Sequence, residues 1–578
     1  MRRRTSPPIA FTLAGAAFFF AAHAWLGAAV PPGDEAVALP PFIVEETAKG
    51  PPWRYGEAMG FEILSRCNDA TTRRVVEAHH QLHELLAEVL PPQLQLRLTL
   101  PRSLILYDEE LQPVASREVV AQLLRQAPQP LDDAPSFGGG RGGRGFQVPV
   151  PSRRYSFLPN LRLWDRDAMT IFMIVRRDGF DPDRLALTQD YVSFLVKSRL
   201  PALPPWFGHG FLALYRQITH EGTQLTLGPL TWISEPHTEA LKKDPPTAPP
   251  VLPLGDFFAI RLAPRDPAAD YEPVAAWQAQ AQLFVRWGLD SGGPARRAAL
   301  WDFVERSATA GPTEELFRAC FGLDFAAARD EIAAYLPAAV RRTIKFRPAR
   351  AAKLPPFTLR NAGDGQIARL KGDWERMEIA YVQARHPELA PKYLEQARRT
   401  FRRGYDRDER DPQLLAAMGL CEADAGNPAG ARELLESAVR IGTIRPRANY
   451  ELARLRLAEF RAQPAGGEGR LGITQAAEVL GPLFAARAQQ PPLPEVYALI
   501  GEVWAEVAAK PSRGHLAVFD EGVRLFPRRA DLALRAAELF LREGFREEAA
   551  NYTEIAARVA TDEATRERAA LLQRQMEK

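Results

Sequence analysis

A sequence repeat in the last part of the chain restricts the fold more than any other feature. Pro446 follows Pro412 by 34 residues, and small residues recur at fixed distances within each copy. Small side chains at such spacing let two helices approach closely, and each helix pair then buries its apolar face on its neighbours. The residues that fit this spacing are Gly419, Ala431 and Ala438 in one copy and Ala537, Ala549 and Ala556 in another. We therefore expect an all-α solenoid of helix pairs from about residue 363 to 578.

The pattern resembles the tetratricopeptide repeat, in which small residues occupy about positions 8, 20 and 27 of roughly 34. Phe519, Gly522 and Pro527 fit the copy before the last, but His515 stands where a small residue is expected. Residues 463–469 interrupt the third copy. The resemblance implies about four to five divergent repeats, whose concave surface binds a protein or peptide partner. Helical hairpins without repeat geometry are the alternative.

Length and charge set broad limits on the rest of the chain. A chain of 578 residues exceeds one typical core, so two or more domains are expected. The net charge of +3 gives no indication of a nucleic-acid partner. The glycine-rich segment 138–145 contains Arg141 and Arg144 and resembles an RGG element, but it lacks aromatic repeats, so a flexible loop is favoured.

The N-terminus predicts export. Three arginines, Arg2 to Arg4, precede an apolar run from Ile9 to Val30, as in a secretory signal peptide. Residues 1–30 are therefore predicted to be a signal peptide, and the compartment to be a bacterial periplasm. The run is long enough that an uncleaved membrane anchor is the alternative. Residues 31–58, rich in proline and glycine, are predicted to form a linker.

Local patterns predict both strands and helices between residues 59 and 340. Strands are expected at 61–64, 96–107, 161–164 and 169–175, the last two joined by a tight turn at 165–167. Helices are expected at 71–90, 271–288, 294–307 and 314–321, with a final one ending near 336. This is an α+β domain, mostly helical in its second half. Residues 341–362 are basic and are predicted to be a linker.

Two further helices are predicted around residues 187–215. Asp181-Pro182 begins the first, Pro201 ends it, and Pro204-Pro205 begins the second. The first carries an apolar stripe of Leu187, Tyr191, Phe194 and Leu195.

This stretch resembles the zinc-site region of peptidase-MA-like gluzincins. In that family the first helix carries H-E-x-x-H, and the second begins near L-P-x-W-x-x-E-G, whose Glu is the third zinc ligand. Gln189 and Ser193 stand at the two His positions, Asp190 at the general base and His209 at the Glu. Zinc requires His, Cys, Asp or Glu ligands, and Gln and Ser are poor substitutes. The resemblance, over about residues 59–340, thus implies a degenerate domain with no zinc, no cofactor and no peptidase activity.

His79 and His83 are the only other candidate metal pair, because they lie four residues apart on one predicted helix. With Glu77 or Glu84 they could hold a metal, but no third ligand is placed by sequence, so we expect a solvated helix face. The sequence therefore predicts an exported, non-catalytic binding or scaffold protein with a protein or peptide partner. The alternatives are an active metal-dependent hydrolase using Asp190 and His209, and a cell-envelope polysaccharide-binding protein.

Overall fold

The structure is a computed structural model of the whole chain. It describes residues 37–40, 51–90, 100–108, 155–157, 160–175, 189–221, 224–230, 251–260, 271–346, 354–407 and 411–577. The predicted signal peptide, the glycine-rich segment and the predicted start of a helix at Asp181 lie outside these residues. Among them, no helix is both long and apolar enough to cross a membrane.

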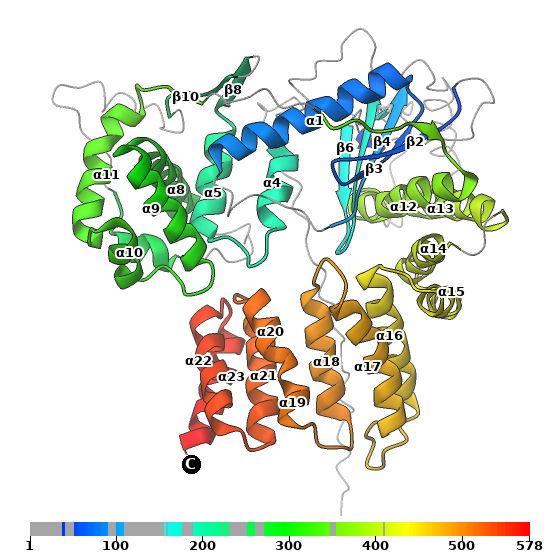
Figure 1. The fold of residues 1–578 in the computed structure, drawn as a ribbon. Coiled ribbons are helices and arrows are strands. Elements are labelled where there is room, and N and C mark those ends of the chain that lie inside the picture. The colour runs from blue at the N-terminus through cyan, green and yellow to red at the C-terminus, as the bar shows by residue number, and fades with distance from the viewer. Residues whose placement is uncertain are drawn as a thin grey trace, which may run out of the picture. The chain divides into compact units, whose positions relative to one another are not determined.

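A six-stranded mixed sheet is the first part of the fold (Figure 1). Its strands, in the order β11-β2-β3-β4-β7-β6, are β11 (Arg360–Asn361), β2 (Arg54–Ala58), β3 (Phe61–Ser65), β4 (Arg102–Asp108), β7 (Met169–Val175) and β6 (Asn160–Trp164). The pairs β3–β4 and β4–β7 are parallel, and the others are antiparallel. The predicted strands at 61–64, 161–164 and 169–175 are confirmed. That at 96–107 is confirmed from residue 102, and residues 91–99 lie outside the described part.

Both predicted linkers were too long. Residues 54–58, assigned to the first linker, form β2, and residues 344–346 and 360–361, assigned to the second, form β10 (Ile344–Phe346) and β11. Strands this short carry too little alternation to be recognised locally, and their partners in the sheet stabilise them. β1 (Val37–Leu39) and β5 (Tyr155–Phe157) pair in parallel in a separate unit of residues 1–39 and 130–157.

Alternate side chains of the sheet enter two different cores, as the period of two requires. On one face Ile63, Leu104 and Leu106 pack with helix α1 (Asp69–Val89), whose N-cap is Asn68. On the other face a separate cluster packs against helix α12 (Asp364–Gln383), and it consists of Trp53, Tyr55, Leu64, Ile105, Tyr107, Leu163, Ala168, Phe172, Leu370, Trp374 and Met377. The ring of Trp374 stacks on that of Phe172 with centroids 5.2 Å apart. The first helix after residue 363 thus shares a hydrophobic core with the sheet.

Helices form most of the chain between β7 and β10, close to the predicted positions. They are α4 (Gln189–Lys197), α5 (Pro205–Tyr215), α7 (Leu254–Ala259), α8 (Tyr271–Asp290), α9 (Gly293–Ser307), α10 (Glu314–Phe321) and α11 (Phe325–Ala339). The same part of the chain forms a small antiparallel sheet of β8 (Ile218–Glu221), β9 (Gln224–Leu227) and β10, in the strand order β10-β9-β8. The core of these helices and that of α1 form one buried cluster.

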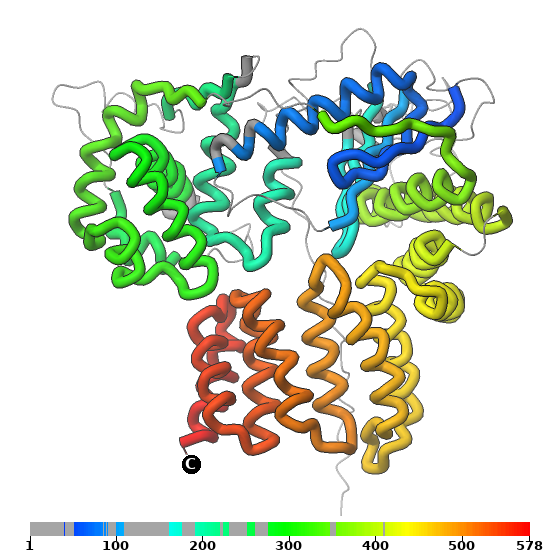
Figure 2. The backbone as a smooth tube through the Cα atoms, in the orientation of Figure 1, coloured from blue at the N-terminus to red at the C-terminus, as the bar shows by residue number. Residues whose placement is uncertain are grey.

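From α12 onward the described chain consists of antiparallel helix pairs. Figure 2 shows the two helices of each pair side by side, each pair followed by the next along the sequence. The pairs are α12 with α13 (Ala390–Tyr405), α14 (Pro412–Asp424) with α15 (Pro428–Arg440), α16 (Pro446–Ala462) with α17 (Ile473–Arg487), α18 (Pro494–Glu506) with α19 (Arg513–Leu516) and α20 (Val518–Leu525), and α21 (Ala530–Arg542) with α22 (Arg546–Val559); α23 (Glu563–Glu577) follows. This arrangement confirms an all-α repeat solenoid.

The predicted small residues lie where the paired helices meet. Ala431, Ala438, Ala537, Ala549 and Ala556 are each 0% exposed. A Cβ atom added at Gly419 would lie only 2.7 Å from Leu435 Cγ, so no larger residue fits between α14 and α15. The predicted interruption at 463–469 falls between α16 and α17. His515 lies in the short helix α19, and its ring stacks on Trp504 at 5.0 Å.

Candidate functional site

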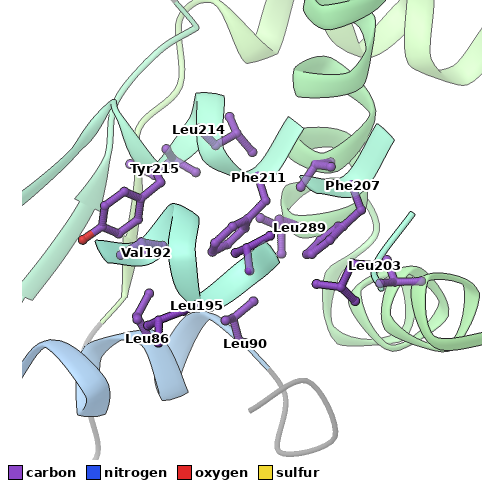
Figure 3. Close-up of a cluster of buried hydrophobic side chains, with 14 of the residues drawn as sticks. Leu86, Leu90, Val192, Leu195, Leu203, Phe207, Phe211, Leu214, Tyr215 and Leu289 are labelled. Carbon is purple, nitrogen blue, oxygen red and sulfur yellow. The ribbon is translucent and has the colours of Figure 1, made fainter. Parts of the chain in front are cut away.

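Helices α4 and α5, which contain the residues predicted to be a degenerate zinc-site region, pack into the core. Figure 3 shows Val192 and Leu195 of α4 and Phe207 and Phe211 of α5 gathered with Leu86 of α1, Leu90 just after it, Leu203, Leu214, Tyr215 and Leu289. The glycine of the motif, Gly210, faces α8, because a Cβ atom there would lie 2.3 Å from the Ala281 carbonyl oxygen. The sequence around His209 therefore has a packing reason that does not involve zinc.

The structure describes only part of the four predicted site positions. Gln189 and Asp190 begin α4, but their side chains lie outside the described part. Ser193 is partly buried, and His209 is exposed with its ring edge-on to Trp277 of α8, 5.4 Å between centroids. Among the described residues no group of three His, Cys, Asp or Glu side chains could hold a metal. The side-by-side placement of Gln189, Ser193 and His209 stays a prediction.

The predicted solvated face at His79 and His83 is wrong. His79 is only 4% exposed, its Nδ1 lies 3.1 Å from the Val75 carbonyl oxygen, and its ring packs against Phe61 and Tyr191. His83 is partly buried, and its Nε2 lies 2.9 Å from the hydroxyl of Tyr191. Periodicity did not reveal this burial, because α4 covers this face of α1 only in the tertiary fold.

The electrostatics of this cluster keep both histidines neutral. Burial, followed by the charge of Arg102, lowers the pKa of His83 to about 3, and burial lowers the pKa of His79 to about 4. Arg102 Nη1 donates to the Tyr191 hydroxyl at 3.1 Å, so that hydroxyl can in turn donate to the neutral His83 Nε2. This series of hydrogen bonds, from β4 through α4 to α1, is therefore a structural network. A metal at His83 would have to displace Tyr191.

A second polar site, which the sequence analysis missed, lies where the β6–β7 turn meets the repeats. The turn was predicted correctly at 165–167, and Asp165 and Asp167 are 10% and 0% exposed in their side chains. Asp165 Oδ2 accepts hydrogen bonds from Arg376 Nη2 of α12, at 2.6 Å, and from Arg447 Nη1 of α16. Arg445 Nη2 lies 3.7 Å from the same oxygen. Three arginines of the helix pairs therefore surround one carboxylate of the sheet.

Asp167 caps helix α16 from outside the helix. Its Oδ2 accepts the backbone N–H of Arg447 at 2.8 Å, and its Oδ1 accepts from Arg445 Nε at 3.2 Å. The N-cap residue of α16 is Arg445, which makes no side-chain cap of its own. An anion at a helix N-terminus satisfies free N–H groups and is stabilised by the helix dipole. The turn therefore supplies the N-terminal cap that α16 itself does not provide.

Two further carboxylates complete this network, which we call the arginine–turn cluster: Asp165, Asp167, Asp373, Arg376, Asp424, Arg445 and Arg447. Asp373 accepts from Arg376 Nε and Arg445 Nη1, both at 2.8 Å, and Asp424 from Arg376 Nη1 at 2.7 Å and from Arg447. The contributing helices α12, α14 and α16 are the first helices of successive pairs, and each contacts the next. The cluster thus lies on the face made by first helices.

Charge balance differs between the two turn carboxylates. Burial alone would raise the pKa of Asp165, but Arg447, Arg376 and Arg445 outweigh it and hold that pKa below its usual value. Burial raises the pKa of Asp167 above its usual value, because Arg445 opposes it less and Asp165 adds to it. The three guanidinium groups therefore hold Asp165 as an anion.

The helix pairs also carry two adjoining hollows on α13. One, of about 550 Å³, is lined by Pro391, Leu394, Glu395, Arg398, Arg399, Arg402, Arg403 and Asp406. The other, of about 460 Å³, is lined by Arg398, Arg402, Tyr405, Met418, Glu422, Asn427, Gly430, Glu433 and Leu434. Arg398 and Arg402 line both hollows, so the two form one groove along α13 that reaches α14 and α15.

No family model and no curated protein matches this sequence. Solved structures of tetratricopeptide (TPR) proteins are similar to about a third of the chain. YrrB, described as a TPR protein with an unusual peptide-binding site, is 16% identical over 34% of this chain and 90% of its own, with a TM-score of 0.26. A thermophilic TPR protein of Thermus thermophilus is 18% identical over 35% and 98%, and MamA 17% over 35% and 95%, each with a TM-score of 0.25. At these TM-scores we draw no inference from the likeness, and the repeat fold rests on the helix pairs and their buried small residues.

Proposed function

We propose that this protein is an exported, non-catalytic binding or scaffold protein. In this proposal the helix pairs after residue 363 bind a protein or peptide partner. The N-terminal domain is a gluzincin-like domain that has lost its zinc ligands.

The observation that carries the binding proposal is the arginine–turn cluster. The acidic turn at residues 165–167 lies outside the helix pairs. Side chains of α12 and α16 and the N-terminus of α16 bind it. Arginine suits this role, because its planar fork of donors matches a carboxylate. Stacked repeats present continuous surfaces of this kind along their length. Helix pairs that bind one acidic segment within the chain have the chemistry to bind another from a partner.

The absence of catalysis is proposed on ligand chemistry. Gln189 and Ser193 offer an amide and a hydroxyl where a zinc site needs two imidazoles. His209 is an adequate ligand by itself, but in the structure its ring lies against Trp277. The alternative, a metal-dependent hydrolase using Asp190 and His209, needs both side chains at one metal.

Metal content and hydrolysis test the catalytic side of the proposal. The purified full chain should hold no stoichiometric zinc and should not cleave unfolded casein, with or without added zinc. About one zinc per chain that is lost in His209→Ala, together with cleavage, would establish the hydrolase instead.

Cell fractionation with N-terminal sequencing tests export. A mature N-terminus just after Ala24 or Ala29 would identify a cleaved signal peptide, and an intact N-terminus in the membrane fraction would identify an anchor. Full-length protein in the cytoplasm would refute export.

A further inference from the structure

The helix pairs bind the β6–β7 turn through each of its three residues. Asp165 and Asp167 are held by arginines of the arginine–turn cluster and by the N-terminus of α16. Between them, the Arg166 Cζ atom lies over the ring of Tyr450, 5.5 Å from its centroid, and Arg166 Nη1 lies 3.7 Å from Glu451 Oε1. Acid, base and acid each meet a group of opposite charge, so the helix pairs recognise the order of charges along the turn.

The apolar contact between the sheet and the helix pairs is made by α12. The buried cluster that joins them contains Leu370, Trp374 and Met377 of α12, and no described residue of α14 or of a later helix belongs to it. Arg528, beyond α20, donates to the Leu203 carbonyl oxygen, which is again a polar contact. Because solenoid pairs are stabilised mainly by their nearest neighbours, the later pairs keep their cores when the turn leaves.

Release of the turn requires a ligand that offers the same charges. Arg447 binds both Asp165 and Asp424, and a buried guanidinium group that loses a carboxylate is costly. A neutral or basic ligand leaves that cost in place, whereas a ligand with two acids removes it. The residue between the two acids meets Tyr450 and Glu451, which favour a basic side chain. The turn therefore defines the chemistry of a ligand that can replace it.

From these contacts we infer that the turn is an internal competitor. It occupies the surface of the helix pairs that binds the partner protein, and the partner displaces it with an acid–base–acid segment. The free protein is thus autoinhibited, and in the partner-bound protein the turn is released from α16 while α12 stays on the sheet. The inference rests on the proposed function, because it names the site and the class of partner.

Fluorescence anisotropy on the full chain tests the competition. The probe is a fluorescein-labelled cyclic peptide that carries Trp-Asp-Arg-Asp-Ala between two disulfide-linked cysteines. Arg166→Glu removes the contact with Tyr450 and brings a like charge to Glu451, so this variant should bind the probe at least about fivefold more tightly than wild type. Arg318→Glu, in an exposed pair with Glu314 on α10, makes the same charge change elsewhere and should bind as wild type does.

Two controls locate the probe on the surface that the turn occupies. A peptide with Asn in place of both acids should bind at least about tenfold more weakly, because its charge-assisted hydrogen bonds are lost. Adding Tyr450→Leu to Arg166→Glu should weaken binding of the acidic probe about threefold, because its arginine loses the ring. Equal affinity of wild type and Arg166→Glu, or no effect of Tyr450→Leu, would overturn the inference.

Carboxyl footprinting follows the turn directly. The side chains of Asp165 and Asp167 are 10% and 0% exposed, so a carbodiimide with glycine ethyl ester should modify them slowly in the free protein. Saturating probe should raise their modification, as read by mass spectrometry. Probe binding that leaves both carboxylates protected would place the probe elsewhere and refute the competition.

Photo-crosslinking separates this inference from the proposed function. The residue p-benzoylphenylalanine is placed at Arg454, exposed on α16 beside Glu451, or at Ile473, which is 69% exposed on α17. Crosslinks to a cellular protein from Arg454 should increase with Arg166→Glu. Crosslinks from Ile473 alone would refute the competition and leave the proposed function standing. Crosslinks from neither position, with no binding of the probe, would count against both.

Discussion

Asp165→Ala should destabilise the protein strongly, because it removes the carboxylate at the centre of the arginine–turn cluster. The change deletes the acceptor of two charge-assisted hydrogen bonds, from Arg376 and Arg447, each contributing about 1.5–3 kcal/mol. Removing one partner of a buried ion pair costs about 3–5 kcal/mol. Arg376 still keeps Asp373 and Asp424. We therefore expect the lower end of that range, a loss of about 3 kcal/mol in the free energy of unfolding.

Urea unfolding of the full chain measures this loss. Circular dichroism follows the helices, and the fluorescence of the ten tryptophans, Trp374 between α12 and the sheet among them, follows the tertiary structure. Asp167→Asn should cost less, about 1 kcal/mol, because the pKa of Asp167 is raised and an amide oxygen can still accept the N–H of Arg447. Asp330→Ala, in an exposed pair with Arg329, is the matched control and should stay within about 0.5 kcal/mol of wild type.

Acid should remove the difference between wild type and Asp165→Ala. The pKa of Asp165 is lower in the folded protein than in the unfolded chain, where it is about 3.9. Such a carboxylate contributes its full stability above the unfolded pKa and loses it as the pH falls towards the folded one. The difference should thus persist from neutral pH to about pH 4 and shrink below it. A loss under about 1 kcal/mol at neutral pH, or a difference that grows in acid, would refute this account of the cluster.

Three further predictions address the other parts of the fold. Gly210→Ala should lower the thermal midpoint markedly, since its Cβ would lie 2.3 Å from the Ala281 carbonyl oxygen; an unchanged midpoint would show that α5 and α8 can separate. The triple change Gln189→His, Ser193→His, His209→Glu should give zinc binding by calorimetry, and a folded variant without it would mean that residues 187–215 are not a decayed zinc site. A chain starting at residue 363 exposes the α12 face that packs on the sheet, so it should aggregate more in light scattering than one starting at α14. Equal solubility would mean that the helix pairs fold without the sheet.

The helices were predictable because their evidence is local. Pro412 and Pro446 begin α14 and α16 as expected, since proline fixes a backbone angle suited to the first helical turn. The buried alanines and Gly419 were recognised from spacing alone, because close helix packing requires small side chains wherever it recurs. The motif around Pro204 and Gly210 likewise placed α5 correctly.

The short strands and the buried histidines could not be found in this way. β2 and β11 are held by hydrogen bonds to each other and to the rest of the sheet, across some 300 residues of sequence. His79 and His83 follow the pattern of an ordinary polar face, and water is removed by the packing of Tyr191 against both and of Phe61 against His79. Burial of a polar face depends on which element covers it, and periodicity carries no information about that.

The sequence by itself determined the helix pairs and the tight turn at residues 165–167, because each depends on the residues at and near those positions. Only the tertiary structure decided what the turn does. Asp165 meets Arg376 and Arg447 from 211 and 282 residues away, and Asp167 caps α16 from 280 residues away. An isolated Asp in a turn is expected to be solvated. The turn carboxylates have a role here because α12 packs on the sheet and brings the arginines of the helix pairs to the turn. A contact between residues so far apart in the sequence leaves no local pattern in it.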